Sequence, residues 1–170
     1  MLATESGRGK VVYATHNDLS EQVRSSSIGL LEARLADCID LQTQMKQAHW
    51  NVKGPNFIAL HELFDKINEE VEEYVDLIAE RAVQLGGIVH GTAREVASRS
   101  TLPEYPVAKD GLQHVKAVTE ALAAFGKGAR AAIDRPAEAG DQDTADLFTE
   151  VSRGVDKWLW FVEAHLQTAR

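Results

Sequence analysis

Apolar residues recur every three or four positions through most of the chain, which is the spacing that one face of an α-helix buries. The first such stretch follows three serines at positions 25–27, which are candidate N-caps, and continues to about Val52. Gly54 and Pro55 end the pattern, because proline lacks an amide hydrogen and restricts the residue before it. We therefore predict a first long helix between these signals. Its expected core-facing residues are Ile28, Leu31, Leu35, Cys38, Met45 and Ala48.

The next stretch, from about Asn56 to Gln84, predicts a second long helix that Gly86 and Gly87 end. It carries an apolar stripe and, beside it, a polar stripe whose members fall within about 100° of the helix circumference. The apolar stripe is Leu60, Phe64, Ile67, Val71, Tyr74, Ile78 and Leu85. The polar stripe is His61, Asp65, Glu69, Glu72, Asp76 and Glu80.

Two further helices are expected after a long connection over 86–110, which contains Gly91, Pro103 and Pro106 and a possible short helix at 92–98. The third helix begins near Asp110, and a short loop marked by Pro136 and Gly140 precedes a fourth, from about Asp141 to Gln167. Their inward-facing residues are Val115, Val118, Leu122, Phe125, Ile133, Phe148, Val151, Val155, Trp158, Val162 and Leu166.

No segment shows the alternating pattern of a strand, so the predicted fold is all-α. Two short hairpins joined by one long crossover describe a ferritin-like four-helix bundle. We place this bundle at 25–168, with a short helix in the crossover between the second and third helices. Residues 1–24 show no sustained period and are expected to form a flexible N-terminal tail.

The composition suits one substantial core, since the chain has 170 residues, of which 44% are hydrophobic. The net charge of −8 argues against a basic, nucleic-acid-coating surface and favours attraction of cations. Cys38 is the single cysteine, so it forms no intrachain disulfide and is expected as a small core residue in a reducing compartment. No apolar run reaches the ~18 residues of a membrane span, and acids stand where a secretory signal needs an apolar core. We therefore expect a cytoplasmic location without membrane contact.

Two histidines flank the predicted break between the first two helices. If those helices are antiparallel, His49 and His61 lie at about the same height on neighbouring helices. His61 and Asp65 are four residues apart and share a helix face, and Asp76 and Glu80 repeat that spacing. The fifteen steps from His61 to Asp76 separate the two pairs by about 22 Å at the helical rise per residue. One ion cannot contact both pairs in one chain.

A second copy of the helix, packed antiparallel about a two-fold axis near Glu70 and Val71, brings the pairs together. His61 then faces Glu80 of the partner subunit, and Asp65 faces Asp76 of the partner subunit. A mixed set of imidazole and carboxylate ligands suits iron(II), with zinc and manganese as competitors. Carboxylates also stabilise the ferric product, which favours iron oxidation. The alternative interpretation is an acidic, solvated helix face that carries two incidental histidines.

Four stretches of the sequence resemble the motifs of the Dps family, the DNA-binding proteins from starved cells or mini-ferritins. They are KQAHWNVKGPNF at 46–57, LHELFD at 60–65, DLIAER at 76–81 and DKWLWF at 156–161. The resemblance covers essentially residues 25–168. It implies a hollow dodecamer, built from two-fold dimers, that oxidises Fe(II) and stores ferric mineral inside. The oxidant is characteristically hydrogen peroxide, with dioxygen as the alternative, and the activity protects DNA from oxidative damage.

The resemblance also assigns roles to residues of this chain. It implies an iron-binding ferroxidase centre at the dimer two-fold axis, with the ligands His49, His61 and Asp65 from one subunit and Asp76 and Glu80 from the other. Trp50 follows His49, and in similar proteins an aromatic residue here and one like Trp160 lie near the centre and scavenge stray oxidising equivalents. Ordinary interface packing explains both tryptophans equally well. Asp146 resembles an acid that lines the three-fold iron entry pore.

Two other functions compete with iron oxidation. The first is compaction of nucleoid DNA, which needs a basic extension to neutralise phosphates. Through residue 27 the bases are balanced by acids, so DNA is expected to be at most a weak partner. The bases are Arg8, Lys10 and Arg24, and the acids are Glu5, Asp18 and Glu21.

The second competing function is that of a large ferritin with a di-iron site inside each bundle. That site needs Glu-x-x-His on two helices, and the motif is absent from this sequence.

Overall fold

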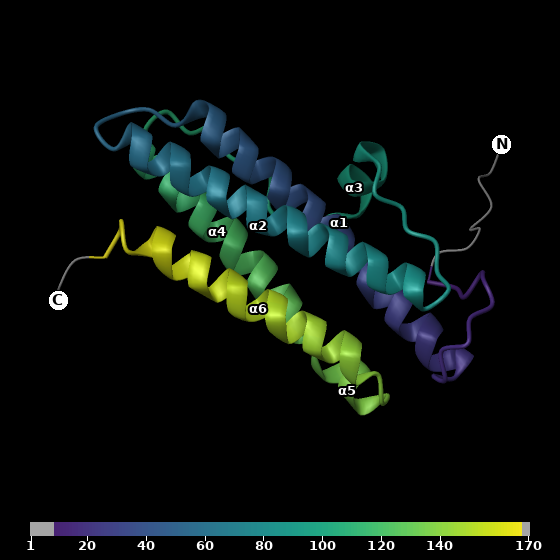
Figure 1. The fold of residues 1–170 in the computed structure, drawn as a ribbon. Coiled ribbons are helices and arrows are strands. Elements are labelled where there is room, and N and C mark those ends of the chain that lie inside the picture. The colour runs from purple at the N-terminus through teal and green to yellow at the C-terminus, as the bar shows by residue number, and fades with distance from the viewer. Residues whose placement is uncertain (1–8, 168–170) are drawn as a thin grey trace.

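The computed structural model describes residues 9–167, and within that range the chain forms six helices and no strand (Figure 1). Four are long: α1 (Glu21–Asn51), α2 (Phe57–Gln84), α4 (Gly111–Ala131) and α6 (Gln142–Glu163). Two are short: α3 (Ala93–Arg99) and α5 (Asp134–Glu138). Helix α1 packs along α2 and α4 packs along α6, with α3 in the crossover between the two hairpins. The predicted all-α, ferritin-like bundle is confirmed.

Side-chain caps fix where the helices begin. Asp110 accepts a hydrogen bond from the backbone of Gln113 at the start of α4, as predicted. The first helix, however, begins at Glu21 and is capped by Ser20, so the predicted start at position 25 is wrong. Ser25 lies inside α1, and its hydroxyl donates a hydrogen bond to the segment that precedes the helix.

Three smaller differences concern the ends of elements. Helix α3 begins one residue later than the predicted 92–98. The loop expected around Pro136 contains the five-residue helix α5, which is too short to show a helical period. Helix α6 ends at Glu163, before the predicted Gln167.

The segment before α1 is hydrogen-bonded to the bundle. The backbone amide of Gly9 donates to the carboxylate of Glu32 over 2.8 Å, and the Ser25 hydroxyl donates to the Gly9 carbonyl over 2.6 Å. The amides of Val12 and Tyr13 both donate to the carbonyl of a glycine that follows α2. The structure thus attaches the segment 9–20 to the bundle and includes 21–24 in α1, in contrast to the tail expected over 1–24. The expectation for residues 1–8 lies outside the described part of the chain.

The core has the composition that the apolar stripes predict. Phe64, Phe125 and Phe148 are fully buried between the four long helices, and almost all the other predicted core residues are buried with them. Cys38 is also fully buried, and burial raises the pKa of its thiol, as expected of a small core residue. None of the helices in residues 9–167 is both long enough and apolar enough to cross a membrane.

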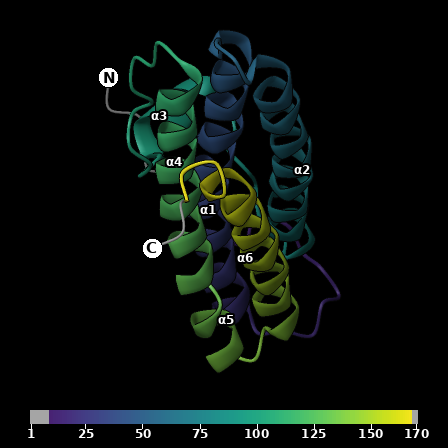
Figure 2. The ribbon, with the colours of Figure 1, turned by 90° about the vertical axis from the view of Figure 1, so that its left-hand side faces the viewer.

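One face of the bundle is left open by this arrangement. Figure 2 shows α3 beside α1 and α4, on the side of the bundle away from α2 and α6. The crossover therefore covers α1 and leaves the polar stripe of α2 accessible. Glu69, Glu72, Asp76 and Glu80 are all exposed on that stripe.

Candidate metal centre

His49 and His61 face each other across the connection between α1 and α2. The Nδ1 atom of His49 lies 2.8 Å from the carbonyl oxygen of His61, and the Nδ1 atom of His61 lies 2.9 Å from the carbonyl oxygen of His49. A carbonyl oxygen only accepts hydrogen bonds, so both Nδ1 atoms carry the hydrogen. In a neutral ring, Nε2 then has a free lone pair, which is the tautomer that a metal ion requires. The rings also stack, with centroids 3.7 Å apart.

The sequence between the two helices explains how the rings meet. Gly54 has φ of +111°, a left-handed conformation that favours glycine, and its carbonyl accepts a hydrogen bond from the amide of Phe57. The chain turns over five residues between Asn51 and Phe57, which sets α2 antiparallel to α1. The ring of Phe57 lies 5.1 Å from that of His61 and packs against it.

Asp65, one turn after His61, is held by a lysine. Lys46 Nζ lies 2.5 Å from Asp65 Oδ1, and Nδ1 of His49 lies 3.9 Å from the same oxygen. The hydrogen bond from Lys46 and the nearby imidazoles lower the pKa of Asp65, against a smaller opposing effect of burial. The carboxylate is therefore ionised at neutral pH, and a metal ion that binds Oδ1 competes with the lysine. Lys46 lies three residues before His49 and so on the same helix face, a spacing that could have marked it from the sequence.

Asp76 and Glu80 lie on the same uninterrupted helix as His61 but fifteen and more residues further along. Helix α2 has no break between Phe57 and Gln84, so the separation of about 22 Å from the helical rise applies. Both side chains are exposed. Within residues 9–167, no group of three or more His, Cys, Asp or Glu side chains comes together closely enough to hold a metal ion. One chain thus presents two separated sets of candidate ligands.

The aromatic candidates lie at the surface of the single chain. Trp50 has 67% of its side chain exposed, directly after His49, and Trp160 on α6 has 61% exposed. The ring of Trp160 meets that of Phe161 edge-on at 4.9 Å. Such exposure of large aromatic rings suits a surface that is covered in an assembly, and it leaves both sequence interpretations of the tryptophans open.

The acids at the start of α6 have different environments. Asp141 is buried, and its carboxylate accepts hydrogen bonds from Ser27, Thr144 and Arg81. Burial raises the pKa of Asp141, but these hydrogen bonds outweigh it and hold the pKa below its usual value. Asp141 therefore caps the start of α6, where its side chain accepts from the amide of Thr144. Asp143 has 85% of its side chain exposed, 3.9 Å from Arg81.

Asp146, the predicted pore residue, is exposed on α6. A three-fold pore forms only between chains, so the role of Asp146 stays a prediction.

The remaining histidines have partners that the sequence did not reveal. The sequence offers no obvious partner for His90 or His114, and the structure supplies one for each. His90 Nδ1 lies 2.7 Å from the buried carboxylate of Glu32, and His114 Nδ1 lies 2.7 Å from the hydroxyl of Tyr105. His165 lies just after the end of α6, with Nδ1 3.1 Å from the Phe161 carbonyl, a favourable place for an imidazole near a helix C-terminus.

Comparison with known proteins places this fold in a class. The ferritin-like domain family matches residues 28–170, so the chain is a ferritin-like protein. It is 46% identical over 156 residues to the DNA protection during starvation protein of Agrobacterium fabrum (strain C58 / ATCC 33970), covering 91% of this chain and 96% of that protein. The protein of the same name from Mycolicibacterium smegmatis is 35% identical over 152 residues, with coverage of 89% and 82%. The solved structure of DpsC from Streptomyces coelicolor superposes with a TM-score of 0.89 at 32% identity, over 99% of this chain and 98% of that one. The chain belongs to the Dps family.

Proposed function

We propose that this protein oxidises Fe(II) with hydrogen peroxide at a centre shared by two copies of the chain. The ferric product is stored as mineral in a hollow dodecamer built from two-fold dimers, and removal of iron and peroxide protects DNA in the cytoplasm. One observation carries the proposal. At one end of α2, hydrogen bonds to backbone carbonyls hold His49 and His61 in the tautomer whose Nε2 can bind a metal ion. About 22 Å along the same helix, Asp76 and Glu80 are exposed and too far away to bind the same ion in one chain.

The chemistry follows from the donor set. Fe(II), as substrate, binds the free Nε2 atoms of His49 and His61 and the carboxylate of Asp65, together with Asp76 and Glu80 of the partner subunit. The ion pair between Lys46 and Asp65 breaks as iron binds, so the iron cation replaces the ammonium group beside the carboxylate. Two Fe(II) ions each donate one electron to hydrogen peroxide, whose O–O bond breaks to give two hydroxide ions. Because both electrons are delivered at one place, little hydroxyl radical is released.

The relatives support this proposal through their names and their likeness. Proteins called DNA protection during starvation protein match over nearly the whole chain. The single chain also leaves two large tryptophan rings exposed, which suits burial in an assembly.

Compaction of DNA by the N-terminal segment is the second candidate, and the structure weakens it. Arg24 donates from Nε to the Leu19 carbonyl and from Nη1 to the Leu85 carbonyl, so its guanidinium is committed to the fold. Of the other two bases in this segment, Lys10 is exposed and Arg8 lies outside the described residues. Protection is therefore chemical in this proposal, with DNA as a weak partner at most.

The proposal is tested on assembled protein isolated by size exclusion. Fe(II) is added without oxygen, and hydrogen peroxide or air is then supplied separately while ferric absorbance is followed. We expect faster oxidation with peroxide, and loss of that rate in Glu80→Ala. Glu120→Ala, which removes an exposed carboxylate from α4, is the matched control and should keep the rate. Equal oxidation by the wild type and Glu80→Ala would contradict the proposal.

A further inference from the structure

Tyr105 and His114 form a buried hydrogen-bonded pair that the proposed iron chemistry does not use. Tyr105 lies in the crossover and has 7% of its side chain exposed, and His114 lies in the first turn of α4 with 1% exposed. The hydroxyl oxygen of Tyr105 is 2.7 Å from Nδ1 of His114. A phenol and an imidazole in direct contact, shielded from water, can exchange a proton without solvent.

The direction of this hydrogen bond follows from counting the groups that would be left without a partner. The Tyr105 hydroxyl contacts Nδ1 of His114, and Nε2 of His114 is buried without a hydrogen-bond partner in the described residues. A hydrogen on Nδ1 would leave both the hydroxyl hydrogen and the Nε2 lone pair unpaired, whereas a hydrogen on Nε2 leaves only that N–H unpaired. We therefore assign Nδ1 as the acceptor and the Tyr105 hydroxyl as the donor.

The charges around the pair keep both partners neutral at rest. Burial raises the pKa of Tyr105 and lowers the pKa of His114. The Asn51 carbonyl and the carboxylate of Asp110 oppose the shift on His114, whereas the ammonium of Lys53 adds to it. Tyrosine therefore keeps its proton, and the imidazole is free to receive one.

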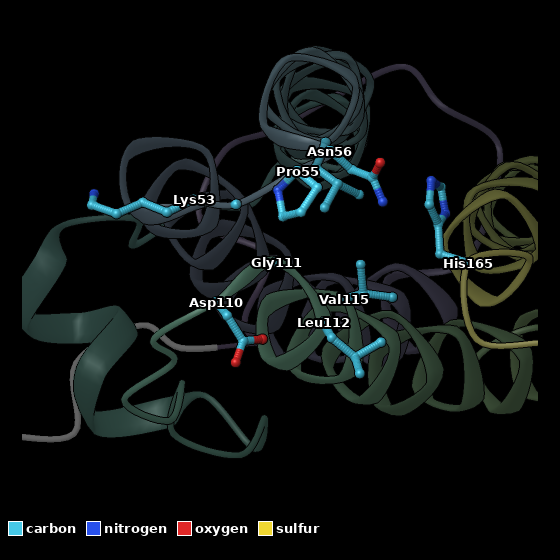
Figure 3. A pocket seen from close by; sticks show the side chains of 10 residues that line it. Lys53, Pro55, Asn56, Asp110, Gly111, Leu112, Val115 and His165 are labelled. Atoms are coloured by element: carbon cyan, nitrogen blue, oxygen red, sulfur yellow. The ribbon is translucent and has the colours of Figure 1, made fainter.

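The pair lies at the end of the bundle that holds the candidate metal centre. Asn51 ends α1, directly after Trp50 and two residues after His49. A cavity of about 380 Å³ opens at this end, and Figure 3 shows Lys53 and Asp110, the two charged residues that act on His114, on its border. Oxidising equivalents that escape the centre therefore arise near this pair.

We propose that Tyr105 is a redox-active site that gives one electron to strong one-electron oxidants formed when Fe(II) meets peroxide, with His114 as its proton acceptor. The electron leaves the phenol ring for the oxidant, which is reduced. The phenolic proton moves to Nδ1 of His114, leaving a neutral tyrosyl radical beside an imidazolium. A second electron, from Fe(II) or a soluble reductant, restores the phenolate, and the proton returns because burial disfavours the charged imidazole. The natural source of the oxidant rests on the proposed function.

Tyr105 has to be distinguished from the two other tyrosines. Tyr13 is 62% exposed, and Tyr74 donates to Glu70 over 2.6 Å on the other side of the core. The chain has three tyrosines, so Tyr13→Phe with Tyr74→Phe leaves Tyr105 as the only one. Because the second substitution removes a hydrogen bond, Tyr13→Phe alone, with and without Tyr105→Phe, provides a second comparison.

The experiment uses the assembled protein with two sources of oxidant. In the first arm, photolysis generates ruthenium(III) tris-bipyridine without iron; in the second, Fe(II) and hydrogen peroxide are mixed and frozen. Electron paramagnetic resonance should detect a tyrosyl radical in the Tyr105-only protein, and Tyr105→Phe should abolish it in both backgrounds. With ¹⁵N-labelled histidine, nuclear coupling should show a protonated ring nitrogen bonded to the phenoxyl oxygen, and His114→Gln should remove that coupling.

The two arms separate the two proposals. Absence of the radical in the photolysis arm, or its persistence after Tyr105→Phe, would overturn the assignment to Tyr105. A radical without histidine coupling would overturn the role of His114. A radical in the photolysis arm together with no iron oxidation in the second arm supports Tyr105 and counts against the proposed function.

Discussion

Mixing two inactive variants gives a quantitative test of whether the metal centre is shared between chains. Asp65→Ala removes a ligand from one end of α2, and Glu80→Ala removes one from the other. A metal ion reaches only about 2 Å to each ligand, whereas about 22 Å of helix separates the two positions. Each variant alone therefore loses both centres of every two-fold dimer.

A dimer with one chain of each kind has a different outcome. One of its centres combines both lesions, and the other combines the intact Asp65 of the Glu80→Ala chain with the intact Glu80 of the Asp65→Ala chain. Half of randomly paired dimers are mixed, so about a quarter of all centres are restored in an isologous two-fold dimer. Peroxide-driven Fe(II) oxidation should recover to about a quarter of the wild-type rate.

The matched control combines Asp65→Ala with His61→Ala. Both residues belong to the same end of the helix, so every centre in a mixed dimer carries one lesion and no rate should return. Co-refolding chains with two different affinity tags verifies that mixed dimers form. No recovery in the first mixture, or equal recovery in the control, would refute the shared centre.

Three other predictions concern separate parts of the molecule. Asp146→Asn should slow Fe(II) uptake at low ionic strength while leaving peroxide-driven oxidation at preloaded centres intact, and stopped-flow measurement of unchanged uptake would remove Asp146 from the entry route. Asp141→Ala should cost about 3–5 kcal/mol of unfolding free energy at pH 7, because it removes the buried carboxylate that pairs with a buried arginine. Since the folded pKa of Asp141 is depressed, its stabilisation is present above about pH 4, the pKa of an unfolded aspartate, and is lost at lower pH; urea titrations should show the two proteins converge there. The assembled protein should not retard plasmid DNA in a gel at physiological salt and neutral pH, and any binding at lower salt should depend on Lys10 and weaken steeply as salt rises; salt-resistant retardation would restore DNA compaction as a principal function.

The sequence predicted those parts of the fold that local chemistry decides. The caps at Asp110 and Asp141 and the break at Pro55 act within a few residues, and the helices begin and end there. The start of α1 was missed because Ser20 caps the helix. Two of the three serines at 25–27, which looked like better caps, instead contact distant residues; Ser27, for example, donates a hydrogen bond to Asp141.

The candidate site was predictable in outline and not in its partners. The facing of His49 and His61 follows from a short connection between antiparallel helices, which the sequence indicates. The pairing of Lys46 with Asp65 spans nineteen residues and depends on the register of that hairpin. The irregular crossover has no periodic sequence pattern, so contacts such as that of Tyr105 with His114 could not be predicted. Assignment of Asp76 and Glu80 to a partner chain stays a prediction.

The reciprocal hydrogen bonds between His49 and His61 have a consequence for how mutations combine. Nδ1 of each histidine donates a hydrogen bond to the backbone carbonyl of the other. Substitution of either one by alanine therefore leaves the remaining ring without its stacking partner and one carbonyl without its donor. The two positions are therefore epistatic before any metal arrives. In a double-mutant cycle on metal-free protein, the second substitution should cost less than the first, with a coupling of about 0.5–3 kcal/mol typical of residues in contact. Once one histidine has been replaced during evolution, replacement of the other therefore costs less stability.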